Sequence, residues 1–346
     1  MRLGISLLRA NQYPWVAGVV QAARARGHGV TIISEWVQLR IPVDRVLVAP
    51  DWPRVGAFDA ILSVSLDPPP GLLARVMTHL QICSWSYRDL ARYNRYRRRY
   101  VWAPGWGTTP WGPGGGESLA VGPAIADQLG PERPRDAFVV LPLPRPWAPL
   151  GWKIGPEPVL FALQCRRLAR RARLKLVLKV RKKHRVPLTL RAVADEIVDD
   201  SRPWEATCLH LMQRARVMVH FYSSAVVEAM LADVPTQMCV SLGGKRMPAY
   251  AERLRHTDFS APARRAFQQS NGESFYDFGD SQSVMMARCG PSWSLGVSTF
   301  LGLKTLPLGS TDISRAAYRE KFLGGEVKHV GERIVDDLER LVRKAG

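Results

Sequence analysis

Short apolar runs alternate with amphipathic stretches through most of this chain. Leu3 to Leu8 is such a run, Val16 to Arg26 has the spacing of an amphipathic helix, and Val30 to Ser34 is a second run. A further run, Ala60 to Val64, is soon followed by an Asp and three prolines. Continuous apolar runs of this kind are typical of parallel strands that are covered on both faces. The pattern predicts an α/β fold with doubly wound parallel sheets.

The clearest unit is the stretch from Val217 to Val240. It reads as a strand, a turn with small hydroxyl side chains, a short helix and a second strand, which is one βαβ unit. Ser223 and Ser224 fall at the start of the helix, where free N–H groups favour an anion such as phosphate. Glu228 follows one turn later and could accept hydrogen bonds from ribose hydroxyls. Alternatively, the serines only cap the helix and Glu228 is a solvated surface residue.

The chain length indicates two domains, because 346 residues exceed one ordinary core. The stretch from Leu141 to Pro158 is rich in proline and tryptophan and looks like a linker, so we place the boundary near residue 150. The predicted domains are residues 1–150 and 151–312, followed by a C-terminal helical segment, 313–346. We expect the second domain to begin with a strand at Val159 to Leu163.

The sequence lacks the features of several classes of protein. The sequence has no run of about 18 apolar residues, and the start MRLGISLL lacks the layout of a signal peptide. The five cysteines are scattered without a CxxC pair, so neither a zinc site nor a disulfide framework is indicated. We therefore expect a cytoplasmic protein without a metal site.

Charge is the unusual feature of the composition. Lys and Arg number 49 against 30 Asp and Glu, which gives a net charge of +19 and favours a polyanionic partner such as nucleic acid or an anionic membrane surface. One stretch interleaves arginines with aromatic residues, a mixture that can contact phosphates and stack on bases. Alternatively, its tyrosines pack inward and its arginines are solvated. The candidate nucleic-acid contacts are Arg92, Arg95, Tyr96, Arg97, Arg98, Arg99 and Trp106.

Two other groups of residues are candidates for chemistry. Asp67 follows a predicted strand and is the first candidate for a catalytic base, with Asp89 second, although an Asp before three prolines is often only a turn former. A basic cluster follows the predicted strand Leu174 to Val180 and could hold a diphosphate, or could be an ordinary basic surface loop. Its candidate ligands are Lys182, His184 and Arg185.

Taken together, the two α/β halves, the linker and the C-terminal helix resemble a GT-B glycosyltransferase. The stretch Phe221 to Ser224 with Glu228, closing at Asp233-Val234-Pro235, is similar to the C-terminal halves of teichoic-acid and capsule transferases and of UDP-N-acetylglucosamine 2-epimerase-like proteins. The resemblance implies that Ser223 and Ser224 bind the donor diphosphate and that Glu228 binds the ribose. Trp106 to Pro110 is similar to a Trp-His-Gly-Thr-Pro segment of that group but lacks its histidine, which disfavours glycerophosphate-polymer chemistry.

The resemblance implies two Rossmann-like domains facing a cleft and sugar transfer from a nucleoside-diphosphate sugar, UDP-linked by preference. It implies no tightly bound cofactor and donor binding without a metal. With the charge, it favours DNA with a hydroxymethylated base as acceptor, as in phage DNA glycosyltransferases. The alternatives are a peripheral-membrane transferase for a surface glycan or lipid-linked polymer, a non-catalytic nucleic-acid-binding protein on this scaffold, and a sugar-nucleotide epimerase. The sequence does not predict the oligomeric state.

Overall fold

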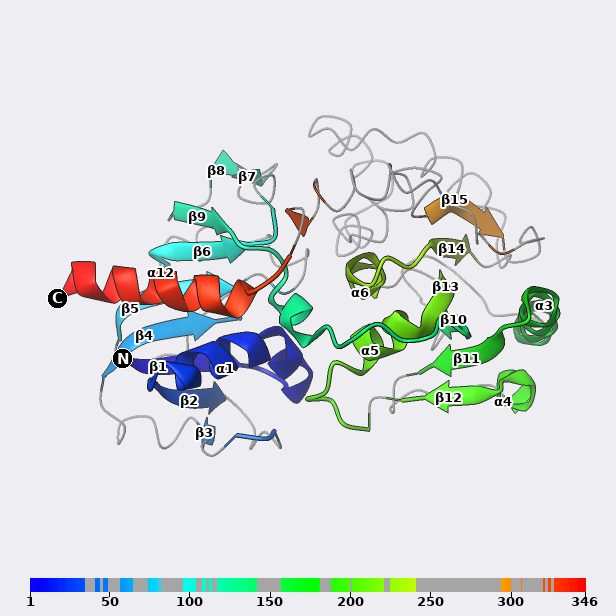
Figure 1. Cartoon of the computed structure of the whole chain (residues 1–346), viewed down its shortest axis with the longest axis horizontal. Coiled ribbons are helices and arrows are strands. Elements are labelled where there is room, and N and C mark those ends of the chain that lie inside the picture. The colour runs from blue at the N-terminus through cyan, green and yellow to red at the C-terminus, as the bar shows by residue number, and fades with distance from the viewer. Residues whose placement is uncertain are drawn as a thin grey trace. The chain divides into compact units, whose positions relative to one another are not determined.

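Figure 1 shows the whole chain as a computed structural model. Its described residues are 1–34, 41–43, 46–48, 57–64, 74–80, 82, 96–103, 108–109, 112–113, 117–141, 157–180, 188–199, 201–220, 225–240, 294–299, 306, 320, 323–324 and 327–346.

The chain forms two compact units, and it passes between them more than once. The first unit contains Met1–Leu129, Arg202–Ala206 and Arg319–Gly346, and the second contains Gly130–Ser201 and Thr207–Tyr318. The division thus lies after Leu129 and not near residue 150, because strand β10 (Ala137–Leu141) pairs with strands of the second unit. The C-terminal segment, predicted as a separate helix, belongs to the first unit.

A parallel sheet forms the centre of the first unit. Its strand order is β3-β2-β1-β4-β5-β6-β9, so the chain moves outward in one direction from β1 and then restarts on the other side. This is the doubly wound pattern that the sequence predicts, with its switch point between β1 and β4. The strands are β1 (Arg2–Leu7), β2 (Gly29–Ser34), β3 (Val46–Val48), β4 (Phe58–Ser63), β5 (Ala74–Leu80), β6 (Arg98–Val101) and β9 (Glu117–Ala120), and β7 (Thr108–Thr109) and β8 (Gly112–Pro113) form a small antiparallel pair.

Helices cover one face of this sheet and bury its core. Alternate residues of β1, including Leu3 and Ile5, pack against α1 (Ala17–Ala25) and α12 (Val330–Ala345) in one apolar cluster. Helices α1 and α12 lie side by side (Figure 1), although their residues are far apart in the sequence. The 3-10 helices η1 (Ala10–Trp15) and η4 (Ala124–Gln128) border the same core. The strong amphipathic pattern at the C-terminus is therefore explained by burial against the first unit.

Helix α12 begins at a close contact that only small residues allow. The carboxylate of Asp127 accepts hydrogen bonds from the backbone N–H groups of Val330 (2.9 Å) and Gly331 (2.6 Å), which satisfies donors at the helix start. Gly331 lies so close to Gly18 of α1 that an added Cβ would sit 2.4 Å from the Gly18 carbonyl carbon. The missing side chains let the two helices approach at this point.

We expect Gly331→Ala to lower the free energy of unfolding by about 1–3 kcal/mol, because the added methyl group meets backbone atoms that cannot rotate away. Gly29→Ala is the matched control, since nothing lies within 4 Å of an added Cβ there. Urea denaturation of both variants measures the difference. Equal stability of the two variants would show that α12 can shift without cost.

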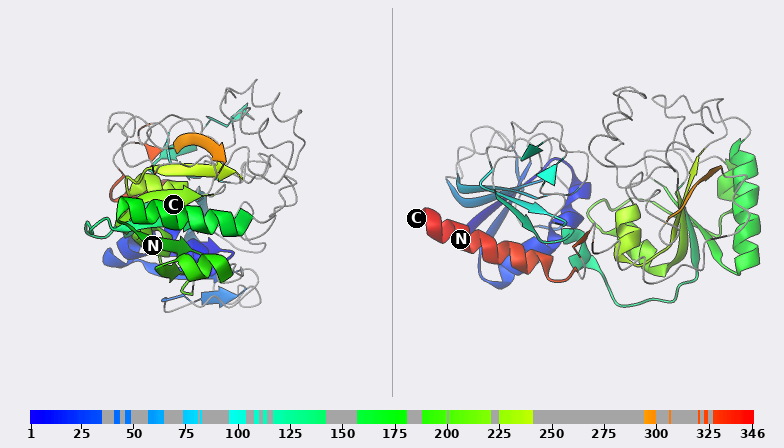
Figure 2. Two further views of the ribbon diagram at one scale, coloured as in Figure 1. Left: turned by 90° about the vertical axis from the view of Figure 1, so that its right-hand side faces the viewer. Right: turned by 90° about the horizontal axis from the view of Figure 1, so that it is seen from above.

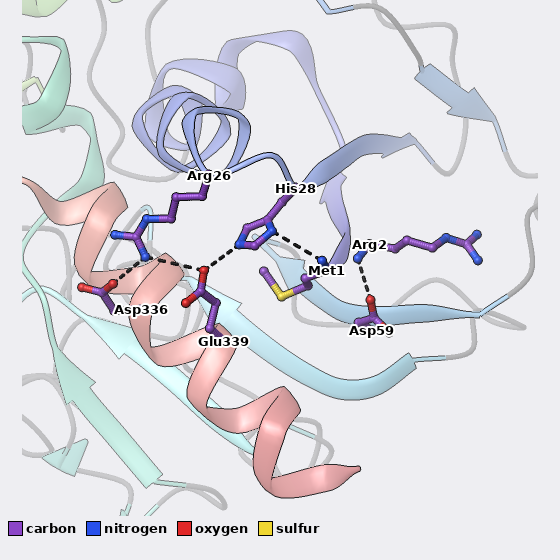
Figure 3. Close-up of polar contacts among 7 residues, drawn as sticks. All are labelled: Met1, Arg2, Arg26, His28, Asp59, Asp336 and Glu339. Carbon is purple, nitrogen blue, oxygen red and sulfur yellow. Dashed lines mark hydrogen bonds and ion pairs between the residues drawn. The ribbon is translucent and has the colours of Figure 1, made fainter.

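Charged groups join the two helices at their solvent-exposed edge. Arg26, which follows α1, pairs with Asp336 of α12 at 2.5 Å, and His28 Nε2 lies 2.7 Å from Glu339 Oε1 (Figure 3). The hydrogen bond with His28 and the nearby positive charges hold the pKa of Glu339 below its usual range. These contacts lie at the surface, so their contribution to stability is small compared with the buried core.

The second unit repeats the doubly wound pattern. Its strand order is β12-β11-β10-β13-β14-β15, with every pair parallel and the switch point between β10 and β13. The remaining strands are β11 (Lys175–Lys179), β12 (Glu196–Val198), β13 (Ala215–His220), β14 (Thr236–Val240) and β15 (Ser294–Thr299), and the helices are α3 (Glu157–Ala172), α4 (Leu188–Val193), α5 (Thr207–Arg214) and α6 (Val226–Leu231).

One predicted element of this unit is wrong. The run Val159 to Leu163, expected as a strand, belongs to helix α3. Ala162, Cys165 and Ala169 are buried at helical spacing and pack on the sheet, whereas Leu163 is 58% exposed. A short apolar run does not distinguish a strand from the first turns of a helix, and here the helical period of the following residues decides.

Candidate functional site

The stretch predicted as a βαβ unit lies at the switch point of the second unit. Strand β13, helix α6 and strand β14 follow one another as the sequence indicates. The last residue of β13, His220, is in register with Leu141, the last residue of β10. The carboxyl ends of these two strands therefore lie side by side at the edge of the sheet. In open α/β sheets ligands bind outside the carboxyl ends of the strands, at the switch point.

Glu228 is the predicted site residue that the structure describes here. It lies in the first turn of α6, its side chain is half-buried, and its carbonyl accepts a hydrogen bond from the Ala232 N–H at 3.0 Å. A helix that follows a parallel strand starts at the carboxyl edge of the sheet, so Glu228 lies near the switch point. Ser223 and Ser224 come just before this helix and lie outside the described residues.

Two buried polar residues end the strands on either side of β10 at the same edge of the sheet. His220 closes β13 and is fully buried, and burial lowers its pKa to about 3, so its imidazole is neutral near neutral pH. Lys179 closes β11 with 7% exposure, and its Nζ donates a hydrogen bond to the carbonyl of Val180 at 3.2 Å. Neither residue was among the predicted site residues. The available signal was a polar residue at the end of an otherwise apolar run.

A row of buried polar side chains crosses the sheet of the first unit. Ser6, Ser63, His79 and Arg99 are in direct register on β1, β4, β5 and β6. They share one face, which is opposite to the face that packs on α1, because Leu3, Ile5 and Leu7 alternate with Ser6. Burial and the positive charge of Arg99 lower the pKa of His79 to about 3. Within this row, Ser63 is the last residue of β4, which borders the switch point of this unit.

The structure contradicts part of the predicted nucleic-acid surface. Tyr96, Arg98 and Arg99 are 1%, 8% and 3% exposed, so their side chains cannot stack on bases or reach phosphates. Tyr96 lies against the ring of His79, with centroids 5.4 Å apart. Arg98 pairs with Asp337 at 3.0 Å and with Glu117 at 2.9 Å. Arg98 thus faces partners within the unit, and Arg99 is buried in register with His79. Of the arginines in this stretch that the structure describes, Arg97 alone is exposed, as the alternative of solvated arginines predicts.

The other candidate residues lie outside the described residues. They are Asp67, Asp89, Arg92, Arg95, Trp106, Lys182, His184 and Arg185. Asp67 follows β4, the strand next to the switch point of the first unit. Among the residues that the structure describes, no cluster of three or more His, Cys, Asp or Glu side chains could hold a metal ion.

Comparisons with known proteins agree with this architecture. No protein-family model and no curated protein matches the sequence. Among solved structures, the wall teichoic acid polymerase TagF, in a form soaked with CDPG, is similar with a TM-score of 0.62 and 11% identity, over 99% of this chain and 89% of that chain. UGT89C1 from Arabidopsis thaliana complexed with UDP-L-rhamnose gives 0.55 and 11%, over 99% and 98%. The UDP-GlcNAc 2-epimerase from Methanocaldococcus jannaschii gives 0.50 and 10%, over 98% and 100%.

The chain has the GT-B fold. This fold contains two doubly wound parallel sheets, and both are present here, with seven described strands in the sheet of the first unit and six in that of the second. The expected fold class is therefore confirmed.

The two buried histidines predict how stability depends on pH. A group whose pKa is lower in the folded protein than its ordinary 6.5 takes up its proton only on unfolding. Stability is thus complete above pH ~6.5 and is lost as the pH falls below that value, by about 1.4 kcal/mol per pH unit for each imidazole. We expect urea midpoints to fall between pH ~6.5 and ~5, and the double variant His79→Gln/His220→Gln to have a flatter profile. An equally steep profile in the double variant would contradict this origin.

Proposed function

We propose that this protein is a glycosyltransferase that takes its sugar from a nucleoside-diphosphate sugar, UDP-linked by preference. The observation that supports it most is the position of β13 and α6 at the switch point of the second unit, within a GT-B fold. UGT89C1, which is similar over nearly the whole chain, is complexed with UDP-L-rhamnose. The second unit is the proposed donor-binding unit.

The donor is held by residues of the second unit in this proposal. Glu228 binds the ribose hydroxyls, and the donor diphosphate lies against the backbone near Ser223 and Ser224. The cations of Lys182 and Arg185 neutralise the leaving diphosphate and His184 donates a hydrogen bond to it, so donor binding needs no metal.

The chemical step is a substitution at the anomeric carbon. The acceptor oxygen forms a new bond to the anomeric carbon, and the bond between this carbon and the diphosphate oxygen breaks. The acceptor proton passes to a carboxylate, Asp67 by preference and Asp89 as the second candidate. The nucleoside diphosphate leaves with the electron pair of the broken bond.

The molecule that accepts the sugar is a separate question from the donor. Modified DNA and a surface glycan or lipid-linked polymer at an anionic membrane are both compatible with a net charge of +19. The burial of Tyr96, Arg98 and Arg99 removes three of the residues that favoured DNA. We therefore place the membrane-associated acceptor first and modified DNA second.

A panel of nucleoside diphosphates and their sugars tests the function. We expect at least one UDP-linked sugar to raise the melting temperature, and labelled sugar to be transferred to a lipid-linked acceptor or to hydroxymethylated DNA. Conversion of UDP-GlcNAc without any acceptor would identify an epimerase. Failure to bind any nucleoside diphosphate would contradict the proposal and favour a non-catalytic protein on this scaffold.

A further inference from the structure

The outer face of helix α3 carries an unusual set of side chains. Leu163, Arg167 and Arg170 follow at intervals of four and three residues, so they share one face of the helix. This face is opposite to Cys165 and Ala169, which pack on the sheet. Leu163 is 58% exposed, and Arg167 and Arg170 are exposed beside it. The helix thus presents a leucine among arginines to solvent.

Further apolar side chains are exposed on the neighbouring elements. Leu188, at the start of α4, is 81% exposed, and Ile197 of β12 is 42% exposed. Helix α4 packs beside α3 (Figures 1 and 2), and β12 is the edge strand, with Ile197 in register with Leu178 on the α3 side of the sheet. Of the four large apolar residues found exposed within the described ranges, three therefore lie on this side of the second unit.

The same surface has an excess of positive charge. Arg167, Arg171 and Arg191 are exposed and form no ion pair with any residue that the structure describes. The nearby carboxylate of Asp195 is already paired with Arg166 at 2.5 Å, and this contact lowers the Asp195 pKa. This carboxylate therefore does not neutralise these arginines.

We propose that this surface, formed by Leu163, Arg167, Arg171, Leu188, Arg191 and Ile197, docks the protein on an anionic lipid bilayer. Arginines at a bilayer surface are attracted to anionic headgroups, while exposed leucine and isoleucine side chains gain by burial at the boundary with the acyl chains. A nucleic-acid backbone would satisfy the arginines but would leave the apolar side chains in water, so lipid fits the whole set better. The described part of the chain has no helix long and apolar enough to cross a membrane.

Flotation of the full chain with vesicles tests the docking surface. We expect it to float with vesicles that contain phosphatidylglycerol and not with phosphatidylcholine alone, and flotation to weaken with added salt. Arg167→Gln/Arg171→Gln should weaken partition by about 25-fold, since each arginine near an anionic surface contributes about a factor of five. Leu163→Ser/Leu188→Ser should weaken it with little change in salt dependence.

Arg133→Gln/Arg216→Gln is the matched control. It removes the same charge from the same unit, but Arg133 precedes β10 and Arg216 lies on the sheet face opposite to α3, because Val217 and Val219 face α3. We expect this variant to float as the unchanged protein does, and circular dichroism to show that all variants are folded.

Several results would overturn the proposal. They are equal flotation with neutral vesicles, unchanged flotation of the α3 variants, binding of duplex DNA but not of vesicles, or a change in oligomeric state caused by the same substitutions. The assay contains no nucleotide-sugar, so its failure would leave the proposed sugar transfer untouched.

Discussion

Asp337→Ala is expected to lower the free energy of unfolding by about 3–5 kcal/mol. The Asp337 carboxylate is 2% exposed and lies 3.0 Å from Arg98 Nε and 3.2 Å from the hydroxyl of Tyr100. Removing it leaves a buried guanidinium without its main counter-charge and a buried phenol without its acceptor. Such an uncompensated charge costs more than the ion pair itself contributes. The loss would be a large part of a typical stability of about 5–15 kcal/mol.

The neighbouring residue provides the control for this experiment. Asp336→Ala removes the same charge from the same helix, but the Asp336 side chain is 54% exposed and pairs with Arg26 at the surface (Figure 3). We expect a loss of at most about 1 kcal/mol. Urea denaturation followed by near-ultraviolet circular dichroism reports on the first unit, where Trp15 and Trp102 stack. Similar losses for the two variants would show that the burial of Asp337 is not what matters.

Glu228→Gln is expected to weaken binding of the preferred nucleoside diphosphate by about 10- to 100-fold. A hydrogen bond to a charged group contributes about 1.5–3 kcal/mol, and the amide keeps the size of the side chain but loses its charge. Because Glu228 is half-buried in the first turn of α6, we expect little change in melting temperature. Isothermal titration calorimetry with UDP measures the effect.

Glu332→Gln serves as the matched control for the binding experiment. Glu332 also lies in the first turn of a helix, but it belongs to α12 in the first unit, and its side chain is 57% exposed. Its replacement should leave the affinity for UDP unchanged. Unchanged affinity in the Glu228 variant as well would remove Glu228 from the donor site while leaving the fold assignment intact.

Local patterns predicted a large part of the fold because the information was contained in neighbouring residues. The unit from Val217 to Val240 has an apolar run, a helical period and a proline stop in sequence, and β13, α6 and β14 follow it closely. The same reasoning failed at Val159 to Leu163. This apolar run is too short to distinguish a strand from a helix. The role predicted for Glu228 follows from its place one turn after Ser224, and it stays a prediction.

Charged residues were harder to place than apolar ones. The sequence predicts Arg98 and Arg99 as surface residues, because arginine is seldom buried without a partner. The partner of Arg98 is Asp337, which lies 239 residues away. No local pattern connects the two positions, so the predicted nucleic-acid contact was wrong there for a physical reason.

The sequence by itself determined the alternation of strands and helices, the doubly wound class and the amphipathic C-terminal helix, since each depends on the periodicity of neighbouring side chains. Only the tertiary structure decided which sheet each segment joins. Strand β10 enters the second unit through pairing with β11 and β13, and α12 returns to the first through Gly18, Asp127 and Arg98. These choices depend on contacts between residues that are distant in the chain, where shape and charge must match in space.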